Sequence, residues 1–107
     1  MSRADWTSQA EADLAALYEY IASRDHRLSV AKNVVLKLRD HCDEYSSLIA
    51  AGHVLGTARD DLGEGVRVFT HQRWVVVFRP NESGIEILRI FDASRDYPHL
   101  FRIQYDN

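Results

Sequence analysis

The spacing of apolar residues changes once along the chain, near residue 55. Before this point apolar residues recur every three or four positions, as on one face of a helix. After it they form short runs rich in Val, Ile and aromatic residues, which favour strands. The pattern therefore predicts a helical first half and a sheet in the second half.

The first half predicts two helices with a short connection at Asp25-His26. Ser8-Gln9-Ala10-Glu11 matches a capping box, so the first helix is expected to begin at Ser8 and to end near Asp25. The second is expected over about residues 27–49, where apolar residues are spaced alternately three and four apart. They are Leu28, Ala31, Val35, Leu38, Cys42, Tyr45 and Ile49. Such a narrow seam suits antiparallel packing, so we expect a helical hairpin.

The second half predicts strands at about 65–70, 73–79 and 84–91, after a loop over residues 53–64. The short connections make these strands antiparallel neighbours. The pattern is also compatible with a short strand at 3–6 and a helical turn after Asp92. The predicted fold class is α+β, a helical hairpin on one face of a small antiparallel sheet. We expect one core made of Leu14, Leu17, Ile21, Val35, Leu38, Val75 and Val77.

Composition narrows the possible classes of protein. The 107 residues, 46% hydrophobic and 27% charged, indicate one globular domain spanning residues 1–107. The net charge of −3 is unlike that of a general nucleic-acid binder. A lone Cys42 excludes an intramolecular disulfide, and no His pair has metal-binding helical spacing, so no metal or cofactor is expected. No signal peptide or membrane-length apolar run is found, which predicts a cytoplasmic protein.

Arginine provides the candidate binding chemistry, because all basic residues except Lys32 and Lys37 are Arg. Arg59, Arg67 and Arg95 are candidates for a cluster that contacts an anionic or carboxylate-bearing macromolecule. Arg89 lies inside an apolar strand and is expected to pair with Asp92 or Asp96. Structural ion pairing and a bias in genome composition are the alternative interpretations of this arginine content.

A series of motifs resembles the ParE branch of the RelE/ParE toxin superfamily over roughly residues 4–101. The motifs, in order, are Trp6-Thr7, Ala10-Glu11-Ala12-Asp13-Leu14, Tyr20-Ile21-Ala22, Gly56-Thr57-Ala58-Arg59-Asp60-Asp61-Leu62, Val66-Arg67-Val68-Phe69, Val77-Phe78-Arg79-Pro80, Ile85-Glu86-Ile87-Leu88-Arg89-Ile90 and Ala93-Ser94-Arg95-Asp96. The resemblance implies a short strand, a helical hairpin and an antiparallel sheet. It also implies a ParD-like antitoxin as partner and inhibition of DNA gyrase.

On this basis we expect a bacterial toxin that is not an enzyme, affects growth and plasmid stability, and has no catalytic residue. Target contact is assigned to Arg59, Arg67 and Arg95. Antitoxin contact is assigned to Leu17, Tyr18, Trp74 and Phe78, of which the last two are alternatively part of the sheet core. Contact with DNA is expected only through the antitoxin.

Two departures from the family pattern define the alternatives. Asp92 stands where the family commonly has His at the start of its H-G-x-R-D ending, which keeps open a degenerate member that only binds its antitoxin. RelE-like relatives cut messenger RNA on the ribosome, so a ribosome-dependent endonuclease is the other alternative. Against it, the chain has no Lys after Lys37, and Phe101 occupies the place of a catalytic Tyr.

Overall fold

The structure is a computed structural model that describes residues 3–105. Its elements follow the α+β order predicted from the sequence. They are β1 (Asp5–Trp6), α1 (Ser8–Asp25), α2 (Leu28–Ala50), β2 (Thr57–Ala58), β3 (Arg67–His71), β4 (Trp74–Asn81), β5 (Gly84–Asp92) and α3 (Tyr97–Tyr105).

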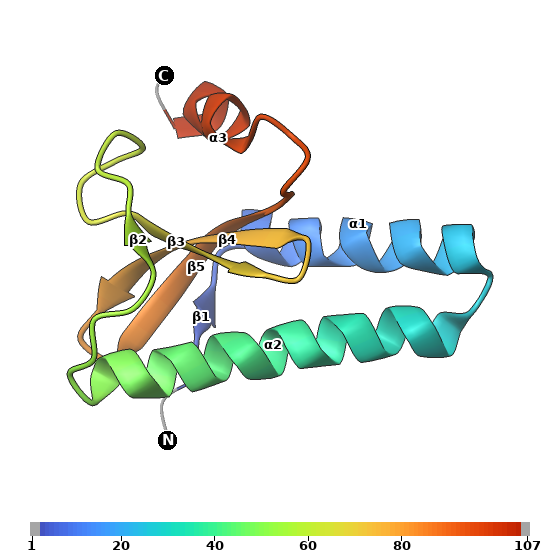
Figure 1. Ribbon diagram of the computed structural model, residues 1–107, viewed down its shortest axis with the longest axis horizontal. Helices are drawn as coiled ribbons and strands as arrows, with labels where there is room; N and C mark the ends of the chain where they lie inside the picture. Colours follow the sequence, from blue (N-terminus) through green and yellow to red (C-terminus); the bar gives the residue numbers. More distant parts are fainter. Residues whose placement is uncertain (1–2, 106–107) are drawn as a thin grey trace.

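The strands form one sheet in the order β1-β5-β4-β3-β2. The three long strands, β3, β4 and β5, are antiparallel neighbours as predicted. The short strand β1 joins β5 in parallel, with Asp5 opposite Glu86. Figure 1 shows α1 and α2 as a hairpin that runs side by side and projects beyond the sheet.

The start of α1 is tied to the edge of β5 by Thr7. Its Oγ1 accepts a hydrogen bond from the backbone N–H of Ala10 at 3.1 Å, so Thr7 is the N-cap and the predicted capping role of Ser8 is wrong. The same hydroxyl donates to the carbonyl of Leu88 at 2.9 Å, and the Thr7 N–H donates to Ile87. Because Thr7 keeps the extended backbone of β1, it can pair with β5 and cap α1 together.

The apolar residues form two cores, one on each face of the sheet, so the prediction of a single core is wrong. The hairpin side holds Ala4, Ala10, Leu14, Leu17, Leu38, Cys42, Phe69, Trp74, Val76, Phe78, Ile85, Ile87 and Ile90. The opposite side holds Leu62, Val66, Val68, Val75, Val77, Leu88, Phe91 and Phe101. All five residues from Trp74 to Phe78 are buried, because alternate side chains of the central strand β4 enter opposite cores.

Two details differ from the prediction: the first residue of the apolar seam on α2 is exposed, and the segment after β5 forms a longer helix than expected. Leu28, the first residue of the predicted seam, is 66% exposed, because α2 begins there, beyond the edge of the core. The helical turn expected after Asp92 is a nine-residue helix, α3, which places Phe101 in the second core. Within residues 3–105, no helix combines the length and apolarity needed to cross a membrane.

Candidate functional site

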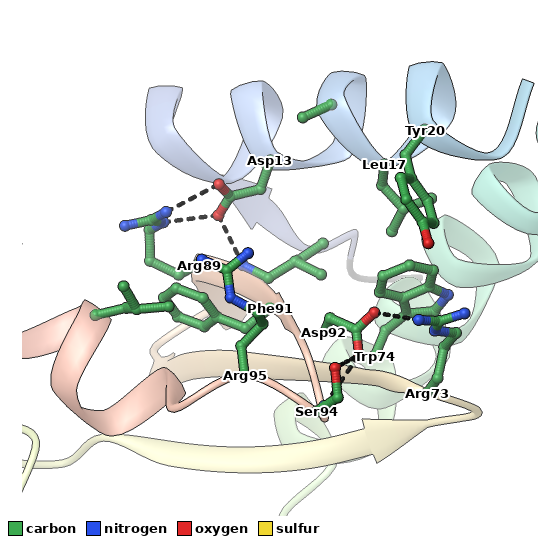
Figure 2. A pocket seen from close by; sticks show the side chains of 13 residues that line it. Asp13, Leu17, Tyr20, Arg73, Trp74, Arg89, Phe91, Asp92, Ser94 and Arg95 are labelled. Carbon is green, nitrogen blue, oxygen red and sulfur yellow. Dashed lines mark hydrogen bonds and ion pairs between the residues drawn. The ribbon is translucent and has the colours of Figure 1, made fainter. Parts of the chain in front are cut away.

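A cavity of about 640 Å³ lies between α1, the start of β4, and the end of β5 with the residues that follow it (Figure 2). This volume is within the usual range for ligand-binding clefts. We call it the α1–β5 pocket. It is lined by Asp13, Ala16, Leu17, Tyr20, Arg73, Trp74, Arg89, Ile90, Phe91, Asp92, Ser94, Arg95 and Leu100.

Asp13 and Arg89 form an ion pair at the β5 wall of the pocket. The Arg89 Nε and Nη2 donate to the two Asp13 carboxylate oxygens at 2.7 and 3.0 Å. The same carboxylate accepts the backbone N–H of Ile90 at 2.9 Å, on the edge of β5 beyond the end of β1. Arg89 is therefore paired as predicted, but the predicted partners Asp92 and Asp96 are wrong. Sequence proximity favoured them, whereas packing of α1 on β5 brings Asp13 to the strand.

Asp92 instead forms an ion pair with Arg73 across the β4–β5 ladder. Its other carboxylate oxygen accepts both the backbone N–H and the hydroxyl of Ser94 at 2.9 Å. These bonds from Ser94, together with Arg73, lower the pKa of Asp92 below its usual value. The Arg73 guanidinium also lies over the Trp74 ring, 5.2 Å from its centroid. Asp92 thus holds Arg73 against the aromatic wall of the pocket.

Arg95 differs from the other two arginines of the pocket. It is exposed, and among the described residues no carboxylate lies within ion-pair distance of its guanidinium. Figure 2 shows the Arg95 side chain extending from the segment after β5 toward α1. Among the described residues that line the pocket, Arg95 is therefore the cation that is available to a ligand.

The three arginines predicted to form a cluster have separate surroundings. Arg59 binds both carboxylate oxygens of Asp61, at 2.9 and 2.8 Å, and the Tyr97 hydroxyl at 2.6 Å. Hydrogen bonding to Asp61 raises the pKa of Arg59 and lowers that of Asp61 to about 2. Arg67 donates to the carbonyls of Leu55 and Gly56, both at 2.8 Å. Of the three, only Arg95 lines the α1–β5 pocket.

The four residues assigned to antitoxin contact lie in different surroundings. Leu17 and Trp74 line the α1–β5 pocket, and Tyr18 is half-buried on α1. Phe78 is fully buried in the hairpin-side core, so it belongs to the sheet core and offers no surface to a partner.

Sequence reasoning missed several residues of the pocket. Asp13 and Tyr20 lie four residues before and three residues after the assigned Leu17 on α1, so helical spacing contained the signal for this wall. Arg73 and Asp92 stand at the two ends of a hairpin made of β4, a turn and β5, and the register that pairs Trp74 with Asp92 brings them together.

Cys42 is not a nucleophile in this fold. Its thiol is buried in the hairpin-side core, and burial raises its pKa to about 12. Over residues 3–105 the structure gathers no group of three or more His, Cys, Asp or Glu side chains able to hold a metal ion.

The order of helices and strands, together with the series of sequence motifs, defines a small α+β protein of the RelE/ParE type. A family model described as the ParE toxin of the type II toxin–antitoxin system parDE matches residues 4–97. The chain therefore belongs to the ParE family of type II toxins, which confirms the resemblance found in the sequence. This membership supports a toxin that is not an enzyme.

One similar solved structure is titled "Chromosomal ParDE TA system from P. aeruginosa". The match has a TM-score of 0.67 and 26% sequence identity, and covers 86% of this chain and 96% of that one. No curated protein sequence matches the chain significantly.

Proposed function

We propose that this ParE toxin inhibits DNA gyrase by binding it, and that a ParD-like antitoxin neutralises it in the cytoplasm. The observation that carries the proposal is the α1–β5 pocket, whose side chains are arranged to bind. Two of its arginines are held in ion pairs, and Arg95 is left exposed beside an apolar floor. The choice of gyrase rests on membership of the ParE family.

A binding role also agrees with the surroundings of Phe101, which stands where RelE-like nucleases have a catalytic Tyr. Phe101, at the place of the catalytic Tyr, is 2% exposed and packed in the second core. A phenyl ring transfers no proton, and a buried one cannot approach an RNA backbone. Asp92 stands at the position of the family's usual His, and its carboxylate already accepts hydrogen bonds from Arg73 and Ser94.

The target is tested by inducing the protein without antitoxin and by adding the purified protein to a gyrase supercoiling reaction. We expect growth arrest with a DNA damage response, and inhibition of supercoiling. Arg95→Ala should weaken both effects. Arg27→Ala, at the exposed tip of the hairpin, is the matched control and should leave them unchanged. Growth arrest with fully active gyrase would refute gyrase as the target.

The antitoxin is tested by coexpression of the chain with a ParD-like protein. We expect growth to recover and the two proteins to copurify. If growth recovers without a stable complex, neutralisation by direct binding is wrong. If the purified complex forms but the free toxin has no effect on growth, the chain is a degenerate member that only binds its antitoxin.

A further inference from the structure

We propose that the α1–β5 pocket binds a peptide segment of a protein partner that inserts an apolar side chain beside a single carboxylate. Arg95 is the anchor for that carboxylate, and Asp92 restricts the pocket to one carboxylate by holding Arg73. This inference concerns the chemistry of the occupant and does not depend on gyrase being the target.

The charges of the pocket define the number of carboxylates. Among the described residues that line it are three arginines and two aspartates, whose net charge is +1. Asp13 neutralises Arg89 through two hydrogen bonds, and Asp92 neutralises Arg73. A partner with one carboxylate completes the pairing, whereas a second carboxylate meets only cations that are already paired.

The pocket floor defines the apolar part of the occupant. Leu17 from α1 and Trp74 from β4 form it on the hairpin side, whereas Phe91 from β5 lines the pocket from the opposite side of the sheet (Figure 2). The cavity of about 640 Å³ has room for one or two bulky side chains. An apolar side chain in this position would remove water from around the Arg95 guanidinium, which strengthens its bond to a neighbouring carboxylate.

The same features favour a peptide over a nucleic acid. Stacking of successive bases needs several accessible aromatic faces, but Trp74 is 6% exposed with Arg73 over its ring, and Phe91 is buried. Among the described aromatic residues of the pocket this leaves the half-exposed Tyr20, and one ring is no platform for successive bases. The carboxylates of Asp13 and Asp92 lie in the pocket and would repel neighbouring phosphates.

Asp92 controls whether Arg73 is available. Its carboxylate binds Arg73 with one oxygen and Ser94 with the other, so it is held on both sides. Replacing it by the isosteric Asn keeps the shape and removes the charge. Arg73 would then offer a second cation, and the pocket would accept two carboxylates.

The test uses the full chain and three acetylated, amidated pentapeptides as probes. They are Ala-Leu-Glu-Leu-Ala, its Gln counterpart Ala-Leu-Gln-Leu-Ala, and Ala-Glu-Leu-Glu-Ala. Binding is followed by NMR shifts of the Trp74 indole N–H and the Arg95 Nε–H. We expect the single-Glu peptide to shift both signals and to bind about fivefold more tightly than the Gln peptide.

Variants then assign the effect to individual residues. Arg95→Gln should reduce binding of the single-Glu peptide to the level of the Gln peptide, while Arg27→Gln should leave it unchanged. Asp92→Asn should favour the two-Glu peptide, and this gain should disappear in the double variant Asp92→Asn with Arg73→Gln. Unchanged folding is checked by the dispersion of the amide spectrum.

Three results would overturn the proposal. The first is that none of the peptides shifts the pocket signals. The second is equal binding of the Glu and Gln peptides. The third is a shift of the same signals by a short single-stranded RNA with no effect of the peptides, which would make the pocket a nucleic-acid site. Loss of gyrase inhibition with intact peptide binding would instead refute only the proposed target.

Discussion

At the residue scale, the Asp13–Arg89 pair differs from the other ion pairs in its burial. The Arg89 side chain is 17% exposed and the Asp13 side chain 15%, whereas the Arg73 side chain is 53% exposed. Water screens an exposed pair and leaves little net stabilisation, but a carboxylate that loses its partner in a partly buried position is costly. The two pairs should therefore respond differently to truncation.

Arg89→Ala is expected to lower the free energy of unfolding by about 3 kcal/mol, because it leaves the Asp13 carboxylate without its cation. Arg73→Ala, the control in an exposed pair, should cost much less, because water already screens that pair. Both values are measured by urea denaturation. Similar losses in the two variants would show that burial does not distinguish the pairs.

At the element scale, α2 illustrates how the position of a leucine on a helix determines its contribution to the free energy of unfolding. Leu38 is fully buried in the hairpin-side core, as the seam predicted, and Leu28 is exposed at the first residue of the helix. The same residue type thus stands in two environments on one element.

Leu38→Ala should lower the free energy of unfolding by roughly 2–5 kcal/mol, since it opens a cavity between α2 and the sheet. Leu28→Ala should change it by less than about 0.5 kcal/mol, because the side chain is already in water. Thermal and urea unfolding of both variants provide the measurement. A marginal loss for Leu38→Ala would mean that α2 is not packed as described.

The contact between α2 and β3 contains His71, whose surroundings disfavour its protonated form. The ring centroids of His71 and His41 lie 4.5 Å apart, and the buried His71 Nε2 has no hydrogen-bond partner among the described residues. Burial, with the nearby His41 and Lys37 of α2, lowers the pKa of His71 below 6.5. The folded protein therefore resists a proton that the unfolded chain accepts.

The sign of the pH dependence follows from this difference. As pH falls through 6.5, the unfolded state binds a proton at His71 while the folded state does not, so stability decreases between about pH 7.5 and 5.5. His71→Gln should flatten this decrease, and His53→Gln, in an exposed loop, should keep it. Urea denaturation at both pH values measures it. A full decrease in the His71 variant would assign the effect to other groups.

Periodicity predicted α1, α2 and the three long strands to within two residues at each end. These elements are long enough to show an apolar repeat, whereas the two residues of β2 are not. The pocket was less predictable. Asp13 reaches Arg89 over 76 positions, and this contact depends on how α1 packs against β5. Leu17, Trp74 and Arg95, which line it, were singled out from the sequence as individual residues, and their binding roles stay predictions.

At the scale of the whole molecule, the sheet separates the residues that a nuclease would need to combine. His71 contacts α2 on the hairpin side, and His99 belongs to α3, which packs on the opposite side. Cleavage of RNA requires one group to activate the 2′-hydroxyl and another to protonate the leaving oxygen at the same phosphate. The fold does not bring this pair of histidines to one site.

The purified toxin should therefore produce no transcript cleavage when it is added to translating ribosomes. Phe101 cannot transfer a proton, and His71 and His99 lie on opposite faces of the sheet, so the acid and base are not assembled. Primer extension on a translated messenger RNA measures this, with a ribosome-dependent endonuclease as positive control. The same preparation should inhibit gyrase supercoiling, which shows that the protein is active. Site-specific cuts that disappear in His71→Ala or His99→Ala would replace the binding mechanism with the nuclease one.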